Sequence, residues 1–477
     1  MLRILAMILR SLVAFALLSS IAAAKAPPNI VMVLVDDMGW GDFSCFGNKD
    51  ASTPNIDRLA KEGIRFRQFY VNSPICSPSR CALTTGQYPQ RWKITSFLEN
   101  RASNERRGMA QWLDPKAPVL AGFLQKKGYA TGHFGKWHLG GQRDVDNAPA
   151  ITSYGFDQSL TNFEGMGPKL LPLTLKPGDK DPGKIWQEAE RLGKPVTWML
   201  RSQITTGFVD AAMPFIDAAV KEMKPFYVNI WPDDVHSPFW PPVDSWKQGK
   251  REQYLAVLEN MDRQLGKLFD HLRDTPELRD NTVVLVCSDN GPEPGAGSAG
   301  DFRGVKGTLW EGGVRSPLIV WAPGLIPTDK AGAVNDRSVF AAFDLAPSLL
   351  KLADATAAEG VAFDGEDVSE TLLGKSEASR KAPVFWRRPP DRKVSGQQAR
   401  RQPDLAVREG NWKLLCEYDG SQSKLFDLAA DPGESKNLAQ DKAEIAARLA
   451  KAAVEWHQSL PADKGPALGA RKKAAGE

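Results

Sequence analysis

The sequence predicts an α/β protein with a large, mostly parallel, doubly wound sheet flanked by helices, plus a small C-terminal α+β subdomain with an antiparallel sheet. Two observations support this fold class. Continuous apolar runs alternate with segments of helical periodicity up to about residue 374, and beyond it short apolar runs alternate with turn signals. We therefore expect a leader at residues 1–24, a main domain at 25–374 and a subdomain at 375–477.

Four apolar runs have the length and composition of strands that are buried on both faces. Such strands read as unbroken stretches of Val, Ile and Leu, because helices cover both sides of a parallel sheet. Three of the runs lead into acidic or amide residues, and sites in doubly wound sheets form just beyond the carboxyl ends of the strands. The four runs are NIVMVLVDDMG (29–39), PFYVNIWPDDVHSP (225–238), TVVLVCSDNG (282–291) and SPLIVWAP (316–323).

Segments between these runs have apolar residues at helical spacing. The segment APVLAGFLQKKGY (117–129) is amphipathic and reaches a helix-ending glycine at Gly128. A turn framed by prolines opens residues 72–89, and the chain then continues as a segment that favours a helix. Further helices are predicted at 251–272 and 344–353.

Two stretches between the helices predict loops. YATGHFGKWHLG (129–140) begins as a strand and ends in a loop that contains a lysine and a histidine. Residues 141–200 are rich in Gly and Pro and weakly periodic. We expect this second stretch to be a loop near the site, because long irregular segments in compact domains are commonly functional.

The C-terminal part has a different pattern. Short apolar runs at 382–389, 405–418 and 423–434 predict antiparallel strands, with turns at Glu409-Gly410 and Asp431-Pro432-Gly433. A closing helix is predicted at 442–460.

Composition and charge exclude several classes of protein. The chain has 477 residues, of which 42% are hydrophobic and 25% charged, as in ordinary globular proteins. The net charge is only +4 and no basic block stands out, so nucleic acid is not an expected partner.

The first residues predict export. Arg3 and Arg10 flank the start of an apolar run at 11–23, and small residues at Ala22 to Ala24 offer a cleavage site. This pattern predicts a signal peptide and a secreted or periplasmic protein without a stable membrane span, the alternative being an uncleaved N-terminal anchor.

The five cysteines do not form a zinc-binding pattern. Five is an odd number, so at least one thiol is unpaired or chemically altered. Cys287 lies inside a predicted strand and is expected to be a buried thiol, whereas a disulfide between Cys45 and Cys81 stays open. The five are Cys45, Cys76, Cys81, Cys287 and Cys416.

Oxygen-bearing side chains follow three of the predicted strands, and the same rim of the sheet should bring them together. Asp36 and Asp37 repel each other unless a positive charge lies nearby. Asp289 and Asn290 add another carboxylate and an amide oxygen, which together make a cage suited to a hard cation, Ca²⁺ rather than Mg²⁺. Either pair by itself is more simply a strand cap; both pairs in one sheet favour a metal site.

Basic side chains supply the other half of the predicted site. Lys136 and His138 are two residues apart and would face one way in an extended segment. His236 follows a strand, and Lys306 lies in a Gly-rich loop that allows close approach of a ligand. Together with Arg80, these residues predict a site that clamps a tetrahedral anion.

The segment CSPSRCALTTG, from Cys76 to Gly86, resembles the signature of the formylglycine-dependent, type I sulfatases of the alkaline phosphatase superfamily. The companion motifs occur in order: DD after the first strand, GKWHLG, HSP, SDNG and KGTLWEGG. The resemblance covers residues 28–460, and the chain is similar to arylsulfatases and N-acetylgalactosamine-6-sulfatases. It implies an alkaline phosphatase-like fold, in which residues 25–374 are the catalytic domain.

The resemblance also implies a mechanism. Cys76 would be oxidised to Cα-formylglycine by the formylglycine-generating enzyme, and one hydroxyl of the hydrated aldehyde would attack the sulfate ester. Arg80, Lys136 and Lys306 would hold the sulfuryl oxygens, His236 would protonate the leaving alcohol, and His138 would remove the proton of the second hydroxyl. The implied Ca²⁺ ligands are Asp36, Asp37, modified Cys76, Asp289 and Asn290.

The favoured substrate is a sulfated polysaccharide or its oligosaccharides. Tryptophans in the site loops, namely Trp137, Trp231, Trp240 and Trp310, would suit stacking on sugar rings, although tryptophan is equally a core residue. Two rivals remain: an esterase for phosphate or phosphonate esters, and a sulfated-glycan binding protein without activity. The sequence leaves open the sugar, the sulfate position, endo or exo action, the oligomeric state, and the roles of Asn162, Glu164, Asp233 and Asp234.

Overall fold

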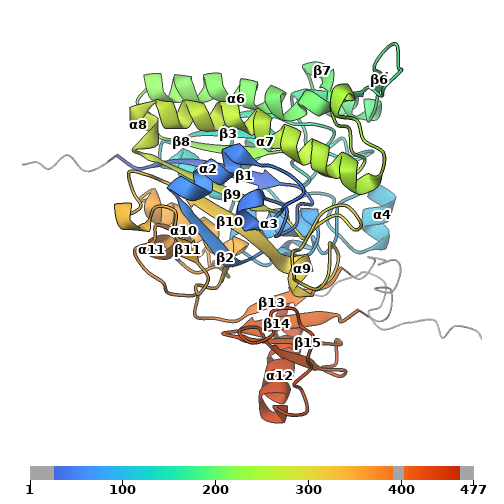
Figure 1. Cartoon of the computed structure of the whole chain (residues 1–477), viewed down its shortest axis with the longest axis vertical. Coiled ribbons are helices and arrows are strands. Elements are labelled where there is room, and N and C mark those ends of the chain that lie inside the picture. Colours follow the sequence, from blue (N-terminus) through green and yellow to red (C-terminus); the bar gives the residue numbers. More distant parts are fainter. Residues whose placement is uncertain (1–25, 390–401, 462–477) are drawn as a thin grey trace, which may run out of the picture.

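The computed structural model describes residues 26–389 and 402–461 (Figure 1). The predicted leader at residues 1–24 lies outside the described residues. Within the described ranges, no helix is long and apolar enough to cross a membrane.

The large, mostly parallel sheet that the apolar runs predicted forms the centre of the main domain and has nine strands. Its central strands pair in parallel, and only β10 runs antiparallel to both of its neighbours. The strand order is β11 (Val334–Asn335), β2 (Ile64–Tyr70), β10 (Arg315–Trp321), β9 (Thr282–Ser288), β1 (Asn29–Val35), β8 (Phe226–Trp231), β3 (Ala130–Gly135) and β4 (Gln158–Leu160), with β12 (Phe340–Ala341) also paired to β2.

Helices cover both faces of this sheet, which explains why its strands are apolar throughout. Alternate residues of β1 point to opposite faces: Val31 and Val33 join one buried cluster, and Ile30 and Met32 join the other. The first face is covered by α2 (Pro54–Glu62), α6 (Ile204–Lys221), α7 (Lys250–Asp274) and α8 (Pro276–Arg279). The second is covered by α3 (Cys76–Thr85), α5 (Leu120–Lys126), α10 (Leu345–Leu352) and α11 (Ser369–Leu372).

The expectation of an irregular loop over residues 141–200 was wrong. This segment contains β4 and a separate three-stranded sheet in the order β6 (Gly183–Lys184), β5 (Lys169–Thr174) and β7 (Val196–Leu200). These strands are short, and β5 pairs in parallel with a strand more than twenty residues away. Short strands paired over such distances leave no local periodicity for the sequence to reveal.

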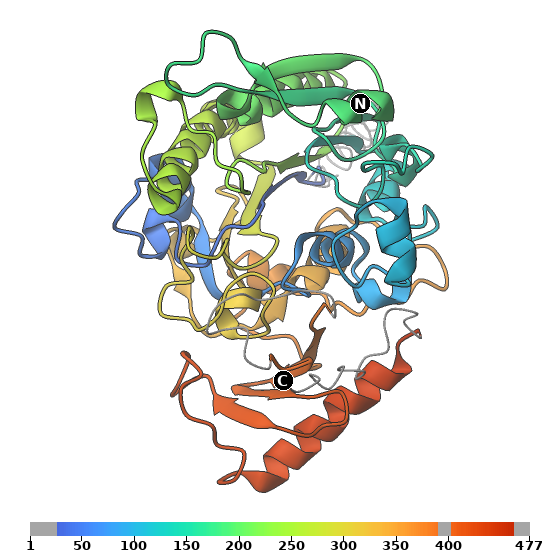
Figure 2. The same cartoon turned by 90° about the vertical axis from the view of Figure 1, so that its right-hand side faces the viewer.

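The C-terminal part forms its own antiparallel sheet below the main domain, as Figure 2 shows. The order is β13 (Val384–Arg387), β14 (Leu405–Glu409), β15 (Trp412–Cys416) and β16 (Lys424–Asp427), and α12 (Ala443–Ser459) packs on one face. The other face packs on the main domain through residues such as Trp386 and Leu415. The predicted turn at Gly410 joins β14 to β15, with φ of +56°.

Candidate active site

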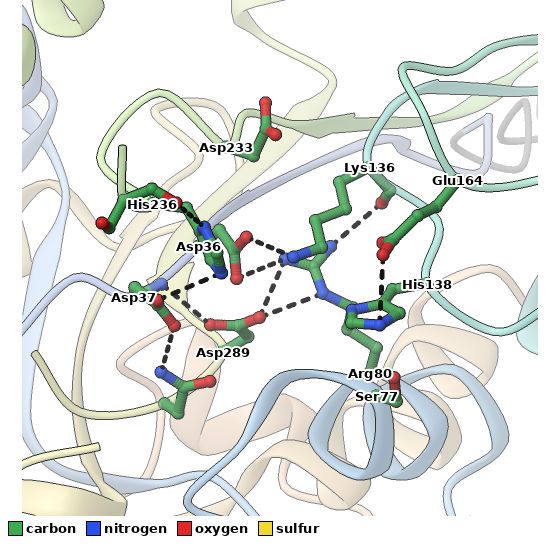
Figure 3. A network of polar contacts seen from close by, with 12 residues as sticks. Asp36, Asp37, Ser77, Arg80, Lys136, His138, Glu164, Asp233, His236 and Asp289 are labelled. Carbon is green, nitrogen blue, oxygen red and sulfur yellow. Dashed lines mark hydrogen bonds and ion pairs between the residues drawn. The ribbon is translucent and has the colours of Figure 1, made fainter. Parts of the chain in front are cut away.

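The carboxyl ends of β1, β8 and β9 meet at one rim of the sheet and carry the predicted acidic residues. Asp36 and Asp37 follow β1, and Asp289 follows β9. One carboxylate oxygen from each of these three lies within 4.8 Å of the others, and all three side chains are buried (Figure 3). The backbone N–H of Asp37 donates to Asp289 Oδ1 at 3.1 Å, which holds the loop after β1 against the loop after β9.

Helix α3 brings Cys76 and Arg80 to this rim. Cys76 is the first residue of the helix and Arg80 lies one turn later, so both side chains lie on the same face. Arg80 is fully buried, with its Nη2 at 2.8 Å from Asp289 Oδ2 and 3.2 Å from Asp36 Oδ1. Its Nη1 donates to the carbonyl of Lys136 at 3.0 Å, so one guanidinium links three loops of the site.

Two lysines complete the charge balance. Lys136 Nζ lies 2.7 Å from Asp36 Oδ2, and Lys306 Nζ pairs with Asp37 Oδ2. Gly135, with φ of +127°, lets the chain turn toward the site at the end of β3, where an added Cβ would clash with the carbonyl oxygen of Trp231 at 2.2 Å. With Arg80 these lysines place three cations against three carboxylates.

The charges control the protonation of the cluster. Burial alone would raise the pKa of Asp36, but Lys136 and Arg80 hold it well below its ordinary value. Burial and the neighbouring Asp36 raise the pKa of Asp289 well above its ordinary value. Burial also raises the pKa of the Cys76 thiol, despite Lys136 and Lys306, so the unmodified side chain stays a neutral thiol.

The donor set fits a hard cation. Asn290 Nδ2 donates to Asp37 Oδ1 at 2.8 Å, which turns the amide so that Asn290 Oδ1 is left buried with no hydrogen-bond partner. Asp36 Oδ1 also accepts no hydrogen bond, although it lies near Arg80. Buried oxygens without partners beside three carboxylates are the ligands that Ca²⁺ prefers.

His138 is oriented by two oxygens. Its Nε2 lies 3.3 Å from Glu164 Oε1 (Figure 3). The same nitrogen lies 3.0 Å from the carbonyl of Leu98, whereas Nδ1 has no hydrogen-bond partner. Nε2 therefore carries the proton and Nδ1 offers a lone pair. Burial lowers the pKa of His138 to about 4, so the ring is neutral near pH 7. The backbone is not extended here as expected, because His138 has φ of +56°.

His236 borders the cluster on another side. Its Nδ1 lies 2.7 Å from the carbonyl oxygen of Ser237, and its Nε2 lies 3.5 Å from Asp37 Oδ2. The side chain is 28% exposed, whereas Lys136 and Asp37 are almost fully enclosed, so His236 lies where the site opens outward. Burial lowers its pKa although Asp37 opposes this shift.

The structure also shows which expectations do not hold. Trp137, Trp231 and Trp310 are at most 5% exposed and so offer no face for stacking on a sugar ring, whereas Trp240 is only half-buried. The five cysteines are free, so Cys45 and Cys81 are not joined, whereas Cys287 is buried as expected. Of the undecided residues, Glu164 contacts His138, and Asp234 Oδ2 accepts from Thr205 instead of joining the cluster.

Sequence reasoning missed Arg201. Its Nη1 lies 2.6 Å from Oδ1 of Asp233, which shortly precedes His236 in the sequence. The side chains of Arg201 and Asp233 are both buried. It follows β7 directly, so the available signal was a basic residue after a strand, but that strand itself was not recognised.

Comparison with known proteins decides the family. The sulfatase family model matches residues 28–355, and a model of the N-sulphoglucosamine sulphohydrolase C-terminal region matches residues 303–458. This chain belongs to the sulfatase family. As a sulfatase it is a sulfuric ester hydrolase, and its fold is that of the alkaline phosphatase superfamily.

Individual sulfatases are similar over most of their length. N-acetylgalactosamine-6-sulfatase of Canis lupus familiaris is 31% identical, with 77% of this chain and 70% of the relative covered. N-acetylgalactosamine-6-O-sulfatase of Bacteroides thetaiotaomicron is 29% identical, with 89% and 92% covered. The solved structure of Ps i-CgsB in complex with k-i-k-neocarrahexaose superposes with a TM-score of 0.74 at 25% identity, covering 91% of this chain and 94% of that chain.

Proposed function

We propose that this protein is an exported sulfatase that hydrolyses sulfate esters of sulfated polysaccharides or their oligosaccharides, with a formylglycine made from Cys76 and a bound Ca²⁺. One observation carries the proposal. Three buried carboxylates and three buried cations converge at the first turn of α3, where Cys76 lies, and two differently held histidines border them. Such a site suits a compact anionic group that is joined to its alcohol through one ester oxygen. That oxygen must be protonated as the alcohol leaves.

The proposed metal ligands are Asp36, Asp37, Asp289 and Asn290, with the modified side chain of Cys76. The unpartnered Oδ1 of Asn290 and the close carboxylates support this assignment. When bound, Ca²⁺ would supply Lewis-acid stabilisation of charge on the sulfuryl oxygens.

The proposed sulfate-binding residues are Arg80, Lys136 and Lys306. Each is buried and bonded to a carboxylate of the site, so it is already fixed before substrate arrives. Fixed cations stabilise developing negative charge without having to reorganise. The formylglycine would supply, as its hydrate, the hydroxyl that attacks sulfur.

The two histidines would move protons at different atoms. His236 Nε2, at the open side of the cluster, would donate a proton to the leaving alcohol, assisted by Lys306. His138 Nδ1, whose lone pair is free, would accept the proton of the second hydroxyl as sulfate leaves. The low pKa of His138 supports this role, because the ring stays neutral and ready to accept.

We further propose that residues 1–24 are a signal peptide and that the mature protein is secreted or periplasmic. The proposed catalytic domain is 25–374 and the C-terminal subdomain 375–477. The formylglycine-generating enzyme would be its partner during maturation. The relatives named for N-acetylgalactosamine-6-sulfate and the neighbour bound to neocarrahexaose support a sulfated carbohydrate as the substrate.

The test is expression with the formylglycine-generating enzyme, followed by mass spectrometry of the tryptic peptide QFYVNSPICSPSR, with a known sulfatase as the control. An aldehyde at Cys76, with sulfate release from sulfated oligosaccharides that Cys76→Ala abolishes, is the expected result. Phosphate and phosphonate esters are assayed alongside and should react more slowly. An intact thiol with a fully converted control, or sulfate release by Cys76→Ala, would overturn the proposal.

A further inference from the structure

A row of side chains runs from the sulfate-binding lysine to the proposed proton donor. Lys136 Nζ lies 5.9 Å from the ring centroid of Phe163, and the rings of Phe163 and Trp186 are 4.0 Å apart. Arg201 Cζ lies 5.5 Å from the Trp186 ring and pairs with Asp233. We call Phe163, Trp186, Arg201 and Asp233 the mouth wall.

The polar end of the mouth wall is tied to the proton donor. The carbonyl oxygen of Asp233 accepts from the backbone N–H of His236 at 3.1 Å and also from Arg201. Burial would lower the pKa of Arg201, but Asp233 and Asp234 raise it and Asp36 adds to this effect. Arg201 is therefore within electrostatic reach of the acidic cluster.

The mouth wall retains unused hydrogen-bonding capacity. Arg201 is 3% exposed and its Nε has no hydrogen-bond partner, and Asp234 Oδ1 beside it also has none. Buried polar groups are normally paired, so unpaired ones at this place point to a partner that the protein itself does not supply. The two aromatic rings, in contrast, are half-buried and keep part of their surface open.

Three of the four wall residues come from a different part of the fold than the sulfate-binding cluster. Trp186 lies between β6 and β7, Arg201 follows β7 directly, and Phe163 lies in the segment just before β5, whereas Asp233 follows β8 of the central sheet. The cluster of acids and cations comes from loops of the central sheet, α3 and the Lys306 loop. Changes in Phe163, Trp186 or Arg201 can therefore alter contacts with the leaving group while the groups around the sulfate stay in place.

We propose that the mouth wall is the subsite that holds the pyranose ring bearing the sulfate ester, an inference that rests on the proposed function. The ester links a sulfate held by Lys136 to an oxygen beside His236, so the ring attached to that oxygen faces the wall between them. Phe163 and Trp186 contact the apolar C–H face of the ring. The Arg201–Asp233 pair, which carries no net charge, binds hydroxyl groups and not a second sulfate.

The experiment compares Trp186→Ala with wild type on two kinds of substrate. One is 4-methylumbelliferyl sulfate, an aryl ester without a sugar, and the other is a set of oligosaccharides of chondroitin sulfate and carrageenan. For the oligosaccharide that wild type hydrolyses fastest, kcat/KM should fall about tenfold or more, as expected for truncating a central tryptophan contact. The aryl ester should change less than about threefold, since its flat ring offers the wall neither the C–H face nor the hydroxyl groups of a pyranose.

Trp198→Ala is the matched control: Trp198 lies in β7 of the same sheet, with its ring against Lys184, and packs on the same buried cluster as Phe163, so it reports any loss that comes from disturbing this sheet. Asp233→Asn is the second variant, with the same selective loss expected. Equal losses on both substrates, no loss on either, or the same selectivity change in Trp198→Ala would overturn the inference. If wild type with modified Cys76 released sulfate from neither substrate, the proposed function itself would fail.

Discussion

Lys413 is a buried cation in the contact between the C-terminal subdomain and the main domain. Its Nζ lies 2.9 Å from Glu311 Oε1 and 2.9 Å from Glu434 Oε1, and all three side chains are 0% exposed. Lys413→Met keeps the volume and removes the charge. Two buried carboxylates are then left facing each other.

The structure sets the magnitude of the loss. Glu311 keeps two partners, Tyr70 Oη at 2.6 Å and Arg315 Nη1 at 3.0 Å, whereas Glu434 keeps only the backbone N–H of Glu311 at 2.6 Å. Removing one member of a buried ion pair typically costs about 3–5 kcal/mol. We expect a decrease of this size in the free energy of unfolding, mostly from Glu434.

The loss should depend on pH. Burial raises the pKa of Glu434 to about 7 in the folded protein, above its ordinary value of 4.5. A group with a raised folded pKa contributes stability at low pH that is lost as pH rises through that pKa. Because Lys413 lowers this pKa, its removal raises the value further, so Lys413→Met should lose more stability at pH 8 than at pH 6.

The assay is urea denaturation followed by tryptophan fluorescence at both pH values. Lys451→Met is the control: the same substitution in the same subdomain, but at a side chain that is 75% exposed and 3.7 Å from Glu455. Surface pairs contribute about 0–1 kcal/mol, so this variant should unfold almost like wild type. A loss below about 1 kcal/mol in Lys413→Met, or one equal to that of Lys451→Met, would refute the reasoning.

Three further outcomes are expected. Removal of the metal with a chelator should abolish sulfate release, and added Ca²⁺ should restore it. The circular dichroism spectrum should stay unchanged, because Arg80, Lys136 and Lys306 still neutralise the acids. Unfolding in step with lost activity would make the metal structural. Cys76→Ser should stall after one turnover, since serine lacks the second hydroxyl, and sustained turnover would contradict this. Burial lowers the pKa of Lys169 to about 7 in the folded protein, from its ordinary value of 10.5. Between these two pH values the unfolded chain binds more protons than the folded one, so the free energy of unfolding of wild type increases as pH rises. In denaturation experiments at pH 7 and pH 9, the free energy of unfolding of Lys169→Met should not show this increase with pH. An increase as large as that of wild type would refute the prediction.

The parts of the fold that the sequence predicted are those with a local signal. The run from Asn29 to Val35 is apolar because helices cover both of its faces, and the acids after it mark the strand end. The three-stranded sheet has no such signal, because β5 is nearly all buried and contains a proline, and its partner lies far along the chain.

The same distinction explains the site. Asp36, Asp289 and Arg80 were predictable because strand ends and one helical turn bring them together, with the resemblance to sulfatases adding their roles. Trp231 was misjudged because a tryptophan near a site has the same sequence signature whether it stacks on a ligand or fills the core. Here it packs against His133 at 4.9 Å between ring centroids and under Arg80. Only tertiary packing separates the two cases.

The contact between the two parts of the chain bears on the site through the loop that carries Lys306. Arg303, near the start of this loop, donates to the carbonyl oxygen of Glu434, and Glu311 at its end is held by Glu434 and Lys413. Both ends of the loop are thus fixed by the C-terminal subdomain, whereas the carboxylate that Lys306 meets, on Asp37, belongs to the central sheet. The geometry of this ion pair therefore depends on how the subdomain docks, which makes the subdomain part of the site's construction although none of its residues is among the acids or cations of the cluster.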